Sequence, residues 1–211
     1  MGPSGSGKST FVNMISTIDS PSKGKIFING KRTTSLSEHA ISKLRFETIG
    51  FVFQEFNLLD NLTIFENISL PLKLAGIGKE SINDRVIEIA NKLNVSELLE
   101  KYPNECSGGQ IQRCSIGRAL INNPKIIIAD EPTGNLDSQN SKNILKLFRD
   151  LNEKFGITIL MVTHDPLTAS YSKKTVNIKD GKIEKTLNRE NKTQREYFNS
   201  ILHLVSGDID L

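Results

Sequence analysis

The nine residues from 2 to 10 read GPSGSGKST and match the pattern G-x-x-x-x-G-K-[ST]. Glycines let successive backbone N–H groups curl around phosphate oxygens, and a helix that follows adds the partial positive charge of its N-terminus. Lys8 would then reach the β- and γ-phosphates of a nucleotide, and the Ser9 hydroxyl would be a ligand of Mg²⁺. The residues predicted to bind a nucleotide are Gly2, Ser4, Gly5, Gly7, Lys8, Ser9 and Thr10.

This pattern normally follows a strand, whereas only Met1 precedes it here. A flexible Gly/Ser linker before a helix is therefore the alternative to a phosphate site. Residues 126–131, which read IIIADE, bear on that choice because they predict a buried strand with two acids at its carboxyl end. Asp130 would hold the water shell of the metal opposite Ser9, and Glu131 would orient or deprotonate the attacking water. An ordinary core strand could end in an acidic turn, but beside a phosphate loop the functional interpretation is favoured.

Hydrophobic periodicity around these two stretches predicts an α/β fold, with a parallel sheet covered by helices on both faces. The predicted strands cover residues 49–53, 125–129 and 158–162, and the predicted hairpins cover 24–30, turning at Asn29-Gly30, and 175–185, turning at Asp180-Gly181. The predicted helices follow the glycine loop through Ile18 and cover 37–47, 83–93, 138–155 and the tail from residue 192 onward. Another helix starts at Thr63, which forms a capping-box pattern with Glu66. We expect one domain over residues 1–211, with a helical lobe inserted at about 58–122.

Composition narrows the classes of function. The chain has 211 residues and a net charge of only +3, with no run of basic residues, so we expect no nucleic-acid partner. Its two cysteines cannot form a disulfide framework and match no zinc pattern, which favours a reducing, cytosolic setting. The longest apolar runs are too short to span a bilayer. A role at a membrane would therefore require docking onto the helices of another protein.

A third motif, Cys106-Ser107-Gly108-Gly109-Gln110, opens a predicted helix. A serine and two glycines at a helix start form a second phosphate cradle from backbone amides and the helix dipole. The alternative is a tight turn with a serine N-cap. Here the sequence resembles the ABC ATPase family, whose signature is usually L-S-G-G-Q. Cys106 replaces the leucine, at a position that packs and does not touch phosphate.

The resemblance extends to further motifs in the family's order. Gln54 resembles the Q-loop glutamine, which touches Mg²⁺ or water and senses the permease, and His164 resembles the switch histidine that contacts the γ-phosphate. Asn135, Leu136 and Asp137 resemble the D-loop, which communicates across a dimer. The resemblance implies a P-loop NTPase fold of the ABC type that hydrolyses ATP, with Glu131, His164 and Gln54 as catalytic residues. It also implies that Ser9, Gln54 and Asp130 are the metal-site residues and that Mg²⁺ is the metal.

Residues 54–72 and 131–137 resemble one subgroup, the macrolide-export, lipoprotein-release and bacitracin-resistance type ATPases. The stretch FNLLDNLTIFENISLPL is most similar to the antimicrobial-peptide resistance branch of that subgroup. The family implies that two such subunits sandwich two ATP molecules, each site combining Lys8 and Ser9 of one chain with Ser107, Gly108 and Gly109 of the other. It implies an integral-membrane permease as partner, a second ATPase subunit in a homodimer, and a peripheral location on the cytoplasmic face of the plasma membrane.

One departure from the family concerns the N-terminus. Family members carry a few tens of residues before the phosphate loop, including an aromatic that stacks on adenine and the strand that feeds the loop. The sequence therefore predicts that the N-terminal strands are missing, through a misplaced start or a truncation. A truncated remnant or regulatory subunit that binds a permease without turnover stays open, as does a permease regulator that signals without transport. ABC ATPases of DNA repair or translation are disfavoured, because the chain has neither long heptads nor a second cassette.

Overall fold

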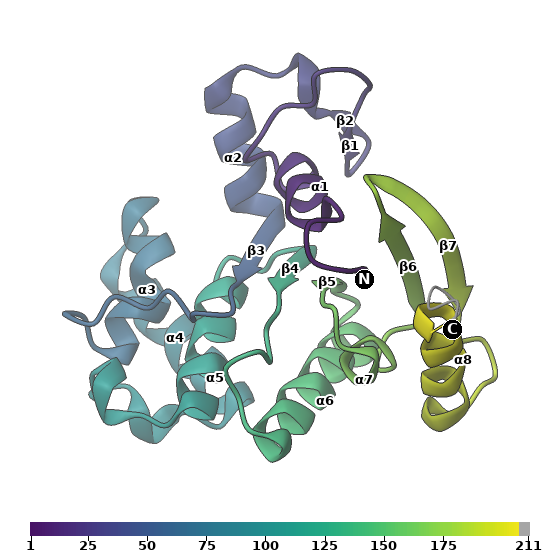
Figure 1. Cartoon of the computed structure of the whole chain (residues 1–211). Helices are drawn as coiled ribbons and strands as arrows, with labels where there is room; N and C mark the ends of the chain where they lie inside the picture. The colour runs from purple at the N-terminus through teal and green to yellow at the C-terminus, as the bar shows by residue number, and fades with distance from the viewer. Residues whose placement is uncertain (207–211) are drawn as a thin grey trace.

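The fold is built around a three-stranded parallel sheet (Figure 1). The structure, a computed structural model, describes residues 1–206, so the last five residues of the predicted tail helix lie outside it. Strands β3 (Ile49–Val52), β4 (Ile126–Asp130) and β5 (Thr158–Val162) lie in the order β3-β4-β5. Their register places Val52 beside Ala129 and Asp130 beside Val162, so the carboxyl ends of the three strands share one edge.

Alternate residues of these strands face two different hydrophobic cores, as the strand period of two requires. Ile127, Ala129 and Met161 pack with α5 (Gly108–Leu120) and α6 (Ser138–Phe155) on one face. Ile128 and Val162 pack with α1 (Lys8–Ile15) and α2 (Glu38–Thr48) on the other. The predicted parallel sheet with helices on both faces is therefore confirmed.

The predicted helical lobe consists of α3 (Ile64–Leu74), α4 (Lys79–Leu93) and α5, joined by the short 3₁₀ turns η2 (Ser96–Leu98) and η3 (Pro103–Glu105). The capping box at the start of α3 is formed as expected, because Thr63 Oγ1 accepts from the Glu66 N–H while the Glu66 carboxylate accepts from the Thr63 N–H. Helix α5 joins the lobe to the sheet. It packs so closely on β3 that a Cβ added at Gly50 would lie 2.5 Å from the carbonyl oxygen of Ala119.

Both predicted hairpins form, each as a separate two-stranded sheet. The first pairs β1 (Phe27–Ile28) with β2 (Lys31–Arg32), and β1 is shorter than the pattern over residues 24–30 predicted. Both turn residues, Asn29 and Gly30, have positive φ. The second pairs β6 (Lys174–Lys179) with β7 (Lys182–Asn188) around Asp180-Gly181. The 3₁₀ turn η1 (Thr33–Ser35), the short helix α7 (Pro166–Ala169) and the helix α8 (Gln194–Ser206) complete the fold.

The helix after the glycine loop is shorter than predicted. It ends at Ile15, because Thr17 adopts a left-handed conformation (φ 63°) and turns the chain away. Ile18, which continues the apolar pattern in the sequence, lies beyond the helix and is 50% exposed. In residues 1–206, none of the helices combines the length and the apolar character that crossing a bilayer requires.

Candidate nucleotide site

The phosphate loop forms an open cradle at the N-terminus of α1. Gly5 and Gly7 have φ of 77° and 92°, a backbone region that residues with a side chain rarely adopt. Gly7 is the N-cap of α1 and provides no side-chain cap, so the helix begins with uncapped amides. Uncapped amides and the helix dipole together favour an anion at this end. Ser4, Ser9 and Thr10 are exposed around the cradle, where a ligand can reach their hydroxyls.

Backbone contacts hold the loop against β6 and the β6–β7 turn. The Ile178 N–H donates to the Met1 carbonyl at 2.8 Å, and the Gly181 N–H donates to the Ser6 carbonyl at 3.1 Å. At Gly2 a Cβ would lie 2.0 Å from the Ile178 carbonyl oxygen, so a side chain does not fit at this position. Lys8 extends across the loop, and its Nζ donates to the Pro3 carbonyl at 2.6 Å.

The two predicted acids stand at the carboxyl end of β4. Burial, and then the neighbouring Glu131 charge, raise the pKa of Asp130, while the Lys8 ammonium opposes that rise. The Lys8 ammonium therefore lies close enough to this carboxyl group to influence its pKa. Glu131 has a left-handed backbone (φ 45°), which is uncommon for a residue with a side chain and is held in place by its N–H bond to the Val162 carbonyl at 3.0 Å.

His164 meets Glu131 at this edge of the sheet. Glu131 follows β4 and His164 follows β5, and parallel neighbours bring their carboxyl ends together. His164 Nδ1 lies 2.7 Å from Glu131 Oε1. The imidazole is 73% exposed and the carboxylate 21% exposed. The pair thus offers one solvent-facing ring and one sheltered carboxylate next to the phosphate loop.

Gln54 is oriented toward the D-loop in this structure. Its Nε2 donates to Asn135 Oδ1 at 3.4 Å, and Asn135 Nδ2 donates back to the Gln54 carbonyl at 3.1 Å. A Cβ at Gly134 would lie 2.7 Å from the Gln54 amide nitrogen. The side-chain amide is therefore engaged by the D-loop and not by Ser9 or Asp130, the other two residues predicted to surround the metal.

The signature motif forms the N-terminus of α5. Ser107 is the N-cap, and Ser107 and Gln110 form a reciprocal capping box in which Gln110 Oε1 accepts from the Ser107 N–H at 2.8 Å. Gly109 is buried against Asn140 of α6, where a Cβ would lie 2.5 Å from Oδ1. Within residues 1–206, no hydrogen bond joins this motif to the phosphate loop.

The D-loop packs beside the signature motif. Asp137 is the N-cap of α6, and its carboxylate accepts from the Asn140 and Gln139 N–H groups. Hydrogen bonds from the Asn140 backbone and side chain lower the pKa of Asp137. Leu136 Cδ2 lies 3.5 Å from the position of a Cβ at Gly108. Cys106 is half-buried against the core, with its thiol 3.6 Å from the Tyr102 carbonyl, so it packs as the sequence predicted.

Sequence reasoning missed three polar side chains on the inner side of α5. Gln112 Nε2 donates to the Pro132 carbonyl, and Ser115 and Arg118 donate to the carbonyls of Phe56 and Asn57. Their positions in the sequence could have indicated this role, because Gln112 and Ser115 share the buried side of α5 with Ile116 and Ala119. A polar residue on a buried helix face requires a partner.

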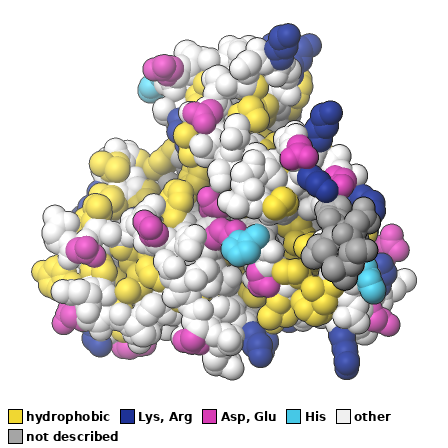
Figure 2. Space-filling model, in the orientation of Figure 1, with side chains coloured by type: hydrophobic (Ala, Val, Ile, Leu, Met, Phe, Trp, Pro, Cys, Tyr) yellow, Lys and Arg dark blue, Asp and Glu magenta, His cyan; other side chains and the backbone are white. Residues whose placement is uncertain are grey.

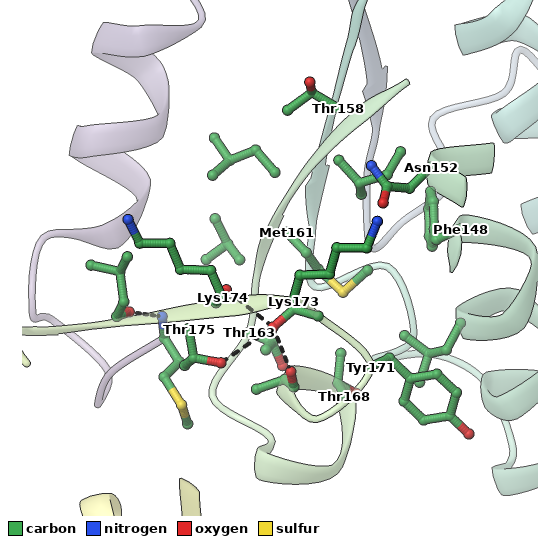
Figure 3. A pocket seen from close by; sticks show the side chains of 18 of the residues that line it. Phe148, Asn152, Thr158, Met161, Thr163, Thr168, Tyr171, Lys173, Lys174 and Thr175 are labelled. Carbon is green, nitrogen blue, oxygen red and sulfur yellow. Dashed lines mark hydrogen bonds between the residues drawn. The ribbon is translucent and has the colours of Figure 1, made fainter. Parts of the chain in front are cut away.

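An apolar groove of about 490 Å³ lies beside the phosphate loop, between β5 and β6 (Figure 3). Val12 of α1, Phe148 of α6, Met161 of β5 and Val176 of β6 are among its walls. Lys8 is the only residue of the phosphate loop that reaches it. The groove separates the edges of two sheets and is suited to apolar groups, so it is distinct from the polar cradle of the loop.

The donor set fits Mg²⁺. Hydroxyl and carboxylate oxygens are the ligands that Mg²⁺ prefers, and it commonly takes only one or two carboxylates together with phosphate oxygens. Ser9 and Asp130 are such donors, and the Ser9 hydroxyl is exposed. In the described residues no group of three or more His, Cys, Asp and Glu side chains could hold a metal by itself. Two such donors would leave most positions around a Mg²⁺ ion to phosphate oxygens and water.

Surface charge gives no sign of a large basic patch on the face seen in Figure 2. The Lys and Arg side chains visible there lie scattered near the edges, and acidic side chains are interspersed among them. Such a mixed surface lacks the single-sign stripe that phosphate backbones bind.

Comparisons with known proteins show the family to which the chain belongs. The model of the family described as "ABC transporter" matches residues 1–134. The bacitracin export ATP-binding protein BceA of Halalkalibacterium halodurans is 46% identical over 202 residues, which cover 96% of this chain and 80% of that protein. The macrolide export ATP-binding/permease protein MacB of Syntrophobacter fumaroxidans is 45% identical over 186 residues, 87% of this chain and 26% of that longer protein.

Among solved structures, the dimeric cassette MJ0796 in a post-hydrolysis state, bound to ADP and Pi, matches with a TM-score of 0.80 and 41% identity. The match covers 89% of this chain and 83% of that one. The subgroup that the sequence predicted, which includes bacitracin and macrolide exporters, is confirmed by these relatives. This chain belongs to the ABC transporter family, as one of its ATPase domains.

Proposed function

We propose that the chain hydrolyses ATP with Glu131 as the general base, and that this drives a membrane permease. The observation that carries the proposal is the Glu131–His164 pair at 2.7 Å, at the edge of the sheet that also holds Asp130. A sheltered carboxylate held by an imidazole is suited to orient and deprotonate a water. Lys8 and the loop amides would bind the phosphates, and Ser9 and Asp130 would hold Mg²⁺, which neutralises phosphate charge when bound.

The complete site would use a second copy of the chain. Ser107, Gly108 and Gly109 lie at a helix N-terminus without a hydrogen bond to the phosphate loop of the same chain, and they would contact the nucleotide of the partner. The D-loop, Asn135 to Asp137, would lie at the same interface. The solved relative MJ0796 is a dimer, which supports this arrangement.

A cleft between the sheet and the helical lobe is the surface that we propose for the permease. Phe46 and Arg45 of α2, Phe51 of β3, Pro71 of α3 and Arg118 of α5 are among the residues that line it. Aromatic walls with two guanidinium groups suit an amphipathic helix that carries a carboxylate. The chain would then act as a peripheral subunit on the cytoplasmic face of the membrane.

For the transported substrate we propose antimicrobial peptides or related amphiphiles, moved by export. The support is the identity of 46% with a bacitracin export protein and of 45% with a macrolide export protein. The permease, and not this chain, would select the substrate. The chain-level chemistry proposed above holds for any such cargo.

A replacement experiment tests the partner and the substrate. The chain would replace the ATP-binding subunit in a strain whose bacitracin resistance depends on BceA, with Lys8→Ala as the inactive control. We expect the wild-type chain, but not the variant, to restore growth at bacitracin concentrations that kill the deletion strain. No restoration by a chain that hydrolyses ATP in vitro would reject the proposed substrate and leave the ATPase proposal standing. If the Lys8→Ala variant folds and restores resistance as well as the wild-type chain does, the result would support a subunit that binds the permease without ATP turnover.

A further inference from the structure

The turn that follows Gln54 has a strained backbone. Phe56 and Asn57 are consecutive, and both adopt left-handed conformations, with φ of 60° and 52°. Asparagine tolerates this region, whereas phenylalanine enters it only at an energetic cost. Such a turn persists only where its surroundings hold it in place.

Helix α5 holds this turn through its side chains. Ser115 Oγ donates to the Phe56 carbonyl at 3.0 Å, and Arg118 Nη2 donates to the same carbonyl at 3.1 Å. Arg118 Nη1 donates to the Asn57 carbonyl. One planar guanidinium thus binds two consecutive carbonyl groups, a geometry that a lysine ammonium does not reproduce. The residues lie about sixty positions apart in the chain, so the contact joins two motifs that are distant in sequence.

Arg118 carries a desolvation cost at this position. It is half-buried on α5, and within residues 1–206 it forms no ion pair. A cation partly removed from water and hydrogen-bonded to neutral carbonyls carries a desolvation cost that an apolar residue would not. An arginine that only filled space could be replaced by a leucine or methionine with a gain in stability. The presence of an arginine here is therefore explained by its hydrogen bonds to the Phe56 and Asn57 carbonyls.

Both ends of the turn reach functional segments. The Phe56 ring lies 3.9 Å from the position of a Cβ at Gly108, the first residue of α5. On the other side, Gln54 is bonded to Asn135 of the D-loop. The Arg118 side chain also lines the cleft between β3 and the lobe. The turn is therefore fixed to the signature helix along most of the length of that helix.

We infer that Arg118, with Ser115, is a positioning residue that makes residues 54–57, the Gln54 loop, move as one body with α5. The inference rests on the proposed function and deepens it, because a permease bound in the cleft would displace Arg118 and the Gln54 loop together. Neither residue belongs to the phosphate loop or to the signature motif. They act by fixing the position of Gln54 relative to the signature motif. Three hydrogen bonds from α5 to the turn after Gln54 set that position.

The test compares two arginines of α5. Arg118→Lys keeps the charge and loses the paired hydrogen bonds, and Arg113→Lys is the matched control, because Arg113 Nη1 donates only to the Leu93 carbonyl inside the lobe, at 3.1 Å. Hydrogen–deuterium exchange of the segment 54–58 in the nucleotide-free chain is measured for both. We expect exchange there to rise by about tenfold in Arg118→Lys and to stay at the wild-type rate in Arg113→Lys. Equal exchange in the two variants would overturn the inference, and this outcome does not depend on ATP turnover.

A double-variant cycle with Gln54→Ala separates positioning from general destabilisation. Coupling through a packed network is typically worth a few-fold to about 30-fold, so we expect Arg118→Lys to lower ATP turnover by about tenfold when Gln54 is present. In the Gln54→Ala background it should cause no further loss. Equal losses in both backgrounds would show a merely structural role. Ser115→Ala, which removes one of the three bonds and retains the guanidinium, carries the same test if Arg118→Lys does not fold.

Discussion

His164 Nδ1 lies 2.7 Å from Glu131 Oε1, although the two residues are 33 positions apart and belong to turns after different strands. The contact is a consequence of parallel pairing between β4 and β5, which places Asp130 beside Val162 and hence Glu131 near His164. The carboxylate is the more sheltered member of the pair, and the ring is the more exposed. This arrangement leaves the carboxylate oriented and the imidazole accessible to a ligand.

Replacement of the histidine tests the pair directly. We expect His164→Ala to lower the turnover of Mg-ATP by about a hundredfold, because a positioned acid–base pair typically contributes 10²–10⁴-fold. ATP binding should change little, because the phosphate loop is intact. The control is His203→Ala, which alters an exposed histidine on α8. Equal turnover in the two variants would contradict a catalytic role for His164.

The phosphate loop can be tested by thermal unfolding with and without Mg-ATP. Ligand at about a hundred times its Kd should add roughly 2.7 kcal/mol to the unfolding free energy. For a chain of this size that corresponds to a rise in Tm of about 5–10 °C. Lys8→Ala should lose most of the rise, whereas Lys154→Ala, which alters an exposed lysine paired with Asp150 on α6, should keep it. A full rise in Lys8→Ala would place the nucleotide elsewhere.

The pKa of Asp130 predicts a pH dependence of stability. Because burial and Glu131 raise this pKa in the folded chain, the folded state binds more protons than the unfolded state between the ordinary and the raised values. Stability therefore falls as pH rises through that window. Asp130→Asn removes the penalty, so its Tm without nucleotide should exceed that of the wild type at pH 7, and the difference should shrink toward pH 4. A Tm difference that is constant with pH, or that grows toward acid, would argue against a raised pKa of Asp130 in the folded chain.

The close contact of β3 with α5 predicts an intolerant glycine. A Cβ at Gly50 would lie 2.5 Å from a backbone oxygen, which cannot move without displacing α5. Overpacking of this kind costs about 1–3 kcal/mol, so we expect Gly50→Ala to lower the unfolding free energy by about 2 kcal/mol or more. At Gly78, the N-cap of α4, nothing lies within 4 Å of an added Cβ. Gly78→Ala should cost under about 1 kcal/mol, the effect of a weaker cap. Denaturant unfolding of both variants compares the two costs.

Much of the sheet and its helices could be predicted, because local signals and tertiary packing agree there. Helix α6 begins after Asp137, which caps it, and ends before Gly156, and β5 covers the predicted apolar run. The turns Asn29-Gly30 and Asp180-Gly181 were equally clear. By contrast, the end of α1 at Ile15 could not be predicted, since the apolar pattern continues to Ile18 and only the folded chain shows the left-handed Thr17.

Within the site, residue types and order could be predicted, but contacts between loops could not. The family resemblance implies that Gln54 is a metal-site residue, and this stays a prediction. The hydrogen bond that the structure shows from the Gln54 amide to Asn135, 81 positions away, could not be predicted. The hydrogen bonds from Arg118 to the Phe56 and Asn57 carbonyls could not be predicted either, because no local sequence pattern specifies which carbonyl a helix side chain will contact. Such contacts depend on how the lobe packs on the sheet.

The most direct test of the account is ATP turnover by the purified chain beside Glu131→Gln. The glutamine keeps the size of the side chain and its place next to His164 but cannot accept a proton as a base. We expect measurable release of phosphate from Mg-ATP by the wild type, a loss of about 10²-fold or more in Glu131→Gln, and unchanged ATP-induced stabilisation in both. Equal phosphate release by the two proteins would contradict Glu131 as the catalytic base. Stabilisation by ATP without turnover in either protein would show a nucleotide-binding chain that does not hydrolyse ATP by itself.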